Sequence, residues 1–220
     1  MSNNNSIEGK PSTLQDSYDV MADEFARRFM DEYDHKPMDR EVLDHFAQRV
    51  AEKGKVCDLG CGPGQLVRYL HERGADVLGV DLSPAMVEEA RRANPDIEFT
   101  QGDMRALDIP DDSLAGIAAF YCIIHIARDD VTGVLRELKR VLQPGGLLLL
   151  AFQLGDQVVH RDEWWGRPVS IDFTFFASEE MAGYLRDAGF EIDEIIEREP
   201  YIEVESPRRR AYILASKPED

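Results

Sequence analysis

The sequence predicts an α/β protein built on a doubly wound, mostly parallel sheet of seven strands that ends in an antiparallel strand hairpin. From residue 55 onward, short apolar segments alternate with amphipathic ones. Alternation of this kind gives a parallel sheet with helices on both faces. The last two predicted strands have only a short turn, ESPR (205–208), between them. Because parallel strands need a crossover of about a dozen residues or more, this last pair must be antiparallel.

The predicted strands are short apolar runs, and several stop at an acidic residue. ADVLGVD ends at Asp81 and IEFTQGD ends at Asp103. The most apolar strand, LLLLAFQ, is far shorter than the roughly 18 residues that suggest a membrane span. The seven predicted strands cover residues 55–59, 75–81, 97–103, 113–124, 147–153, 190–199 and 209–217.

The predicted helices carry apolar side chains at helical spacing and have recognisable ends. Ser83 is an expected N-cap with Pro84 at the first helical position, and Gly74 and Gly189 each end a helix. Between the strands, helices are predicted over 65–73, 83–93, 129–142 and 178–189, and two more precede the first strand at 14–32 and 38–51.

A chain of 220 residues fits one domain, which we expect at 14–220. Residues 1–13 lack the positive region and apolar stretch of a signal peptide, so we expect a disordered tail on a cytoplasmic protein. The helices within 14–51 are expected to form an amino-terminal cap over one end of the sheet. The irregular segment 154–177 is expected to be an insertion on the substrate side.

Charge and cysteine content exclude several classes of function. The net charge of −18 argues against a nucleic-acid or anionic-membrane partner. The only basic run, Arg208–Arg210, is either a solvated strand entrance or an anion site near the substrate. Cys57, Cys61 and Cys122 form no CxxC pair, which predicts reduced thiols. No cluster of residues indicates a metal site.

The segment DLGCGPG follows the first predicted strand and precedes a helix. A glycine-rich turn at such a place brings a nucleotide-like ligand against bare backbone. A dinucleotide fingerprint would need its third glycine at Gln65, and no GK[ST] of a P-loop follows. The pattern is instead DxGxGxG, running from Asp58 through Gly60 and Gly62 to Gly64.

Three acids at three successive strand ends indicate which ligand this turn holds. Asp58 can lie near a cationic amino group or hold the loop by accepting backbone N–H bonds. Asp81 is placed to accept from the hydroxyls of an unphosphorylated ribose. Asp103 can accept from an exocyclic amine such as that of adenine, with Met104 over the ring face. The set suits a ligand with ribose, adenine and ammonium parts and no phosphate.

These motifs resemble those of the class I S-adenosylmethionine-dependent methyltransferases, especially small bacterial members related to the ubiquinone and menaquinone methyltransferases. DLGCGPG, VDLS and GDM carry the resemblance, and FYCIIHI and LKRVLQPGGLLLLAF extend it over nearly the whole chain. It implies a Rossmann-like methyltransferase fold, S-adenosylmethionine as cofactor, and a Tyr18 that closes over it. The predicted cofactor-binding residues are Tyr18, Asp58, Gly60, Cys61, Gly62, Gly64, Asp81, Leu82, Met86, Asp103, Met104 and Tyr121.

The best candidate for a catalytic base is His125, just past the fourth predicted strand. Its alternative role is to hydrogen-bond a loop and organise the site. Transfer from a sulfonium is an in-line displacement, for which the protein mainly aligns the reactants and excludes water. A base helps only when the acceptor must lose a proton.

The acceptor pocket is predicted in the segment 154–177. Its adjacent tryptophans indicate an aromatic wall with a nearby cation for an acidic group, or else a lid or dimer contact. The expected acceptor is a small molecule, aromatic or carboxylate-bearing, and the expected state is a monomer or homodimer. The predicted acceptor residues are His160, Trp164, Trp165 and Arg167, with Arg161 in the same segment.

The leading hypothesis is therefore O- or N-methylation of a small molecule. A second hypothesis is a non-catalytic S-adenosylmethionine-binding sensor or partner subunit. A third, an NAD-dependent dehydrogenase, is opposed by Gln65 and Asp58.

Overall fold

The computed structural model describes residues 11–219. Seven strands form one sheet in the order β3-β2-β1-β4-β5-β9-β8. The first five pair in parallel, whereas β9 is antiparallel to both β5 and β8. The predicted fold class is confirmed. The strands are β1 (Val56–Leu59), β2 (Val77–Asp81), β3 (Glu98–Gln101), β4 (Leu114–Phe120), β5 (Leu142–Gln153), β8 (Glu191–Arg198) and β9 (Arg210–Ser216).

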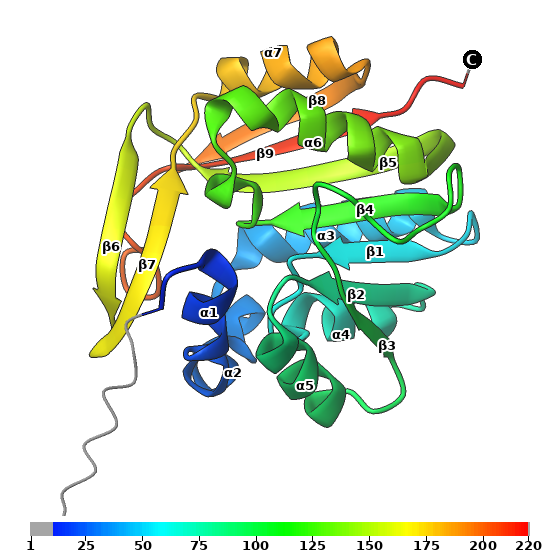
Figure 1. Ribbon diagram of the computed structural model, residues 1–220. Coiled ribbons are helices and arrows are strands. Elements are labelled where there is room, and N and C mark those ends of the chain that lie inside the picture. The colour runs from blue at the N-terminus through cyan, green and yellow to red at the C-terminus, as the bar shows by residue number, and fades with distance from the viewer. Residues whose placement is uncertain (1–10, 220) are drawn as a thin grey trace, which may run out of the picture.

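Helices cover both faces of this sheet (Figure 1). The helices α3 (Pro37–Val50), α4 (Gln65–His71) and α5 (Pro84–Ala93) bury apolar residues against one face, and α6 (Arg128–Val141) and α7 (Ser178–Ala188) against the other. Successive residues of the central strands join the two cores in turn. In β5 the leucines at 147 and 149 face the α3 side, and those at 148 and 150 face the α6 side. The uninterrupted LLLL run follows from a strand that is buried on both faces.

Several strand boundaries differ from the prediction, and two differences change the connections between elements. β5 begins at Leu142, which pairs with Leu114 of β4, so QPGG lies within the strand and does not separate it from α6. β8 and β9 are antiparallel as predicted, but residues 199–209 connect them and the turn is not short.

The predicted helix over 14–32 is also wrong as a single element. The chain instead forms α1 (Leu14–Asp19), α2 (Ala22–Phe29) and a 3₁₀ turn, η1 (Glu32–His35). Met21 is fully buried at the break between the first two. Tertiary packing there overrides the continuous helical periodicity. Most of the predicted tail lies outside the described residues, and Thr13 is the N-cap of α1.

The segment 154–177 is not irregular. It forms an antiparallel hairpin, β6 (Val158–Trp164) and β7 (Arg167–Thr174), which stands beside α1 and apart from the main sheet (Figure 1). Trp165 and Gly166 both have positive φ, 51° and 75°, as a two-residue hairpin turn with matching twist requires. The alternation was present in RPVSIDFT, where residues 169, 171 and 173 are buried, but charged residues in β6 hid it.

No helix among residues 11–219 is both long enough and apolar enough to cross a membrane.

Candidate active site

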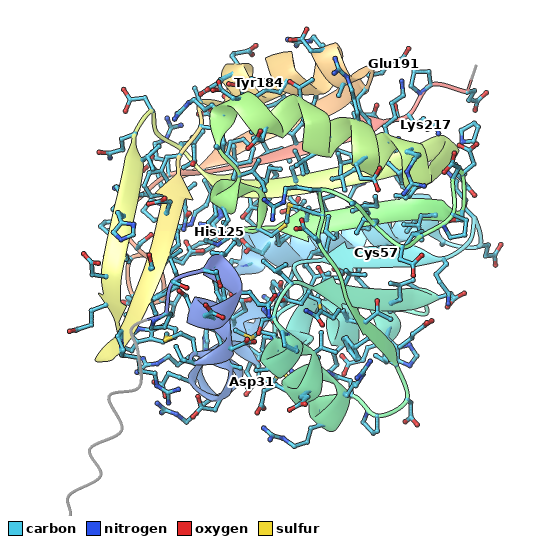
Figure 2. All side chains as sticks on the ribbon, viewed as in Figure 1. Asp31, Cys57, His125, Tyr184, Glu191 and Lys217 are labelled. Atoms are coloured by element: carbon cyan, nitrogen blue, oxygen red, sulfur yellow. The ribbon has the colours of Figure 1, made fainter. Side chains whose placement is uncertain are left out.

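A cavity of about 1090 Å³ lies at the carboxyl ends of β1, β2 and β4. The glycine-rich loop and the strand ends form its floor, and α1, α2 and the β6–β7 hairpin form its walls. Figure 2 shows His125 between the end of β4 and this hairpin. A ligand in this cavity therefore contacts segments from both ends of the chain.

The loop after β1 is held beneath the end of β2. The backbone N–H groups of Gly60 and Cys61 donate to Val80 O at 2.7 and 3.1 Å. Gly60 has φ 69°, and a Cβ there would lie 2.4 Å from Cys122 Cβ. Gly64 has φ 88° as the N-cap of α4, where a Cβ would lie 2.8 Å from Asn94 Nδ2. Both positions therefore require glycine, because φ is positive and there is no space for a Cβ.

Of the loop residues predicted to contact cofactor, Gly60, Cys61 and Gly62 line the cavity, and Gly64 does not. Gly64 lies behind the loop, where it starts α4. A Cβ on Gly62 would meet nothing closer than Gln65 Oε1 at 3.9 Å.

The three strand-end acids line the same cavity but differ in environment. Asp58 is 2% exposed, and burial, with Asp81 and Glu32 nearby, raises the pKa of its carboxyl well above the usual range. Burial also raises the pKa of Asp81, to about 6, against the opposing effect of two backbone N–H donors. Those donors are Gly62 N and Ser83 N, each 2.8 Å from an Asp81 oxygen.

The Asp103 carboxylate is held by a residue of the turn that it begins. The Arg105 guanidinium donates to both carboxylate oxygens, with Nη2 to Oδ2 at 2.6 Å, and this lowers the pKa of Asp103. Leu82, Met86 and Met104 also line the cavity, so the predicted adenosine side of the site is brought together.

The chain leaves β4 in a strained conformation. Tyr121 has φ 55°, a left-handed value that is uncommon for a bulky residue, and it lines the cavity. The predicted strand over 113–124 therefore ends at Phe120, and Ile123–His125 form the 3₁₀ turn η2.

Tyr18 and His125 form a pair at the cavity wall. The Tyr18 hydroxyl lies 2.7 Å from His125 Nε2, and His125 Nδ1 lies 3.0 Å from Asp172 O. Because a carbonyl only accepts, Nδ1 carries the proton and Nε2 accepts from the tyrosine. Burial lowers the pKa of His125 to about 4 and raises that of Tyr18, so both groups are neutral at pH 7.

An aromatic cluster closes the cavity on the hairpin side. Trp164 and Trp165 lie with ring centroids 5.0 Å apart, and Phe25 of α2 lies 5.4 and 5.3 Å from them. Trp164 also contacts Phe173 at 5.5 Å. The predicted aromatic wall is thus completed by a ring from the amino-terminal helices.

Two predicted acceptor residues are not brought into the cavity. His160 is exposed, and its Nδ1 lies 2.7 Å from Asp172 Oδ1. Arg167 pairs with Asp23 of α2, with Nη2 to Oδ2 at 2.9 Å. Neither lines the cavity, whereas Arg161 does. Side chains on a strand alternate between faces, so Arg161, although exposed, lies on the cavity face of β6 and His160 lies on the other face.

Comparison with known proteins agrees with this geometry. Residues 56–146 match the family described as Methyltransferase domain. Trans-aconitate 2-methyltransferase of Shigella dysenteriae is 34% identical over 172 residues, which cover 72% of this chain and 64% of the relative. Demethylmenaquinone methyltransferase of Beutenbergia cavernae is 34% identical, with 62% of this chain and 59% of the relative covered. The chain spans about half the length of the first curated relatives it matches, with 52% of two of them covered.

A solved structure matches over a longer stretch. A putative methyltransferase, solved in complex with the Haloferax volcanii Trm112 methyltransferase activator, superposes with a TM-score of 0.73 and 25% identity. The match covers 94% of this chain and 99% of that one. Residues 56–146 thus resemble the domain of S-adenosylmethionine-dependent methyltransferases, and the chain has the fold of a putative methyltransferase.

The cofactor of this methyltransferase family is S-adenosylmethionine, and the buried polar atoms of the cavity fit it. Among the described residues, Asp58 Oδ2 and Gln65 Oε1 are buried acceptors with no donor. Gln65 Nε2 donates to Glu32 Oε1 at 2.9 Å, which adds a second carboxylate beside Asp58. An ammonium group has three donors and no acceptor. The ammonium of the methionine part would supply what these acceptors lack.

Sequence reasoning missed several residues of this cavity. Glu32 and Phe25 come from the amino-terminal helices, where amphipathic spacing gave no sign that they face a ligand. Gln65 was treated only as a failed glycine position. Its place at the start of the helix after the loop was the signal that could have found it.

Cys57, Cys61 and Cys122 are all free and buried, and burial raises the pKa of each thiol. Among residues 11–219, no group of three or more histidine, cysteine, aspartate or glutamate side chains is arranged to hold a metal.

Proposed function

We propose that this protein transfers the methyl group of S-adenosylmethionine to an oxygen or nitrogen of a small-molecule acceptor. The observation that carries the proposal is a single cavity that contains the strand-end carboxylates and, on its other side, the Tyr18–His125 pair. Ligand sites of open α/β sheets lie outside the carboxyl ends of the strands, as this one does.

S-adenosylmethionine supplies an electrophilic methyl group on a sulfonium, and the chain's own residues align and enclose it. Asp58 would hold the ammonium and Asp81 the ribose hydroxyls. Asp103 and Met104 would hold the adenine. Gly60 and Gly62 let the backbone approach closely because neither carries a Cβ.

The hairpin and α2 would exclude water from the transfer step. Trp164, Trp165 and Phe25 form a continuous aromatic wall beside Tyr18, whose ring lies 5.6 Å from that of Phe25. Closure of an active site strengthens electrostatic interactions inside it and prevents side reactions.

His125 is the proposed residue on the acceptor side. Its Nε2 already accepts a hydrogen bond from the Tyr18 hydroxyl. It can therefore accept one from the O–H or N–H group of a substrate that displaces this hydroxyl. A pKa near 4 makes it a weak base at pH 7, which favours orientation of the acceptor over full proton removal.

The test is turnover. Purified protein is incubated with S-adenosylmethionine and an extract of small metabolites, and S-adenosylhomocysteine is measured by mass spectrometry. Product formation above the no-extract control supports an enzyme. Tight S-adenosylhomocysteine binding without turnover would favour the sensor or partner-subunit function, because a fold alone does not fix the reaction. Tight binding of NADH without any binding of S-adenosylhomocysteine would overturn both the enzyme function and the sensor function.

A further inference from the structure

Two arginines that line the cavity have no carboxylate partner among the described residues. They are Arg161 of β6 and Arg208 of the β8–β9 connection. The other cavity arginines are all ion-paired: Arg27 and Arg28 with Glu24, Arg105 with Asp103, and Arg210 with Glu205. In a chain of net charge −18, two arginines that line a cavity without a carboxylate partner are unusual.

Both guanidinium groups lie over aromatic rings of the hairpin. Arg161 Cζ is 5.8 Å from the Phe173 ring centroid and 5.6 Å from that of Trp164. Arg208 Cζ is 4.0 Å from the Phe175 ring centroid. A cation over a ring face is held by the ring's quadrupole, which uses none of the guanidinium N–H donors. The cation–ring contacts thus leave the Arg161 donors available to a ligand, together with those Arg208 donors that Gln157 does not use.

The two rings belong to one wall. Phe173 and Phe175 are two residues apart in an extended segment, so their side chains project to the same side, about 7 Å apart. The ladder continues past β7, since Phe175 N donates to Gln157 O at 2.9 Å. With the Gln157 amide turned so that its oxygen faces Arg208, this oxygen accepts from Arg208 Nη1 at 3.0 Å and from Nη2 at 3.2 Å. This contact fixes the guanidinium without neutralising its charge.

The arginines lie close to the proposed reaction centre. The His125 ring centroid is 5.2 Å from that of Phe173, so His125 and the Arg161 guanidinium contact the same ring. A small molecule that reaches His125 with one end can therefore reach Arg161 with the other.

We propose that Arg161 and Arg208 form the subsite that holds a carboxylate of the methyl acceptor, so that the enzyme acts on small carboxylic acids. This inference rests on the function proposed above. A guanidinium offers a planar fork of N–H donors, which matches the two coplanar oxygens of a carboxylate. The clamped carboxylate is the anchor, and the accepting atom lies toward His125.

The first experiment removes the carboxylates from the acceptor pool. A metabolite extract is coupled with methylamine through a carbodiimide, which converts carboxylic acids to N-methylamides, and is compared with a mock-treated extract. We expect S-adenosylhomocysteine formation to fall to the no-extract level with the coupled extract. Equal turnover with both extracts would overturn the inference and leave methyl transfer intact.

A phosphatase-treated extract separates the two common anions. Turnover that is lost after phosphatase and retained after amide coupling would overturn the carboxylate assignment, because a guanidinium also binds phosphate. Absence of turnover with the untreated extract would instead count against the proposed function itself.

The second experiment tests the two side chains. We expect Arg161→Gln and Arg208→Gln each to raise the extract concentration for half-maximal turnover by about tenfold or more, the usual effect of losing a hydrogen bond to a charged group. S-adenosylhomocysteine affinity should stay unchanged, which shows that the variants fold.

Arg209→Gln is the matched control. Arg209 belongs to the same basic run, is half exposed, pairs with Glu197 and Glu199, and does not line the cavity. The Arg209→Gln variant should reach half-maximal turnover at the same extract concentration as the wild type. If all three variants behave alike, the two cavity arginines are packing residues and the subsite does not exist.

Discussion

The cofactor side and the acceptor side of this cavity are built in different ways. On the cofactor side, a buried backbone loop is fixed by hydrogen bonds to the end of β2, and its glycines tolerate no added atom at Gly60. On the acceptor side, side chains from the β6–β7 hairpin, α1, α2 and the β8–β9 connection line the cavity together, and no single loop carries them. The first is suited to one invariant ligand, and the second can change its ligand by substitution of surface side chains.

The largest effect is expected where the backbone has no freedom. Gly60→Ala places a Cβ 2.4 Å from Cys122 Cβ at φ 69°. We expect it to lower the free energy of unfolding by about 3 kcal/mol and to abolish S-adenosylhomocysteine binding. Denaturant unfolding and calorimetry measure the two effects.

Gly62→Ala is the control for that change, since φ there is 53° but a Cβ meets nothing closer than Gln65 Oε1 at 3.9 Å. Its loss should be about 1 kcal/mol, from the left-handed backbone alone. Equal losses in the two variants would contradict the steric argument.

The next effect concerns the charge of Asp81. The raised pKa of about 6 means that this carboxyl gains its charge as the pH rises through 6. Ribose hydroxyls donate best to the ionised form, so S-adenosylhomocysteine affinity should rise between pH 5 and 7 and level off above. In Asp81→Asn the affinity should be about 10- to 100-fold lower, because hydrogen bonds to a charged acceptor are lost, and the rise should disappear. A rise that persists in the variant would assign it to another group.

An effect of similar size, on turnover and not on cofactor affinity, is expected at the Tyr18–His125 pair that joins the two sides. His125→Ala should lower turnover by about 10- to 100-fold while S-adenosylhomocysteine affinity changes less than twofold, as for a residue that orients the acceptor. With a pKa near 4, His125 gives no inflection between pH 6 and 8. Unchanged turnover with a confirmed acceptor would remove the residue from the mechanism.

The smallest effects test which side chains of the hairpin contact the methyl acceptor. Trp164→Ala should raise the KM for acceptor by about tenfold, since part of a buried aromatic contact is lost. Arg167→Gln, on the same hairpin but outside the cavity, should change it less than twofold. If Trp164→Ala and Trp165→Ala both leave the KM unaltered, the aromatic wall does not contact the acceptor.

The predictable part of the site is the part that depends on local sequence. Asp58 lies in β1, Gly60 and Gly62 lie in the loop that follows it, and Asp81 ends the next strand, so their spacing alone indicated a shared ligand. The hairpin was missed because β6 carries His160, Arg161 and neighbouring acids where an apolar alternation was sought. His160 and Arg167 were expected in the pocket because sequence proximity to the tryptophans does not tell which face of a strand a side chain occupies.

The amino-acid sequence by itself determined the alternation of strands and helices, the glycine loop and the acids at the strand ends. Each of these follows from backbone conformation or from residues a few positions apart. Tertiary structure alone decided that Tyr18 meets His125 across 107 positions, that Glu32 joins Gln65, and that Arg161 and Arg208 face one cavity. Such contacts depend on how separate elements pack, and no local pattern encodes which side chains that packing brings together.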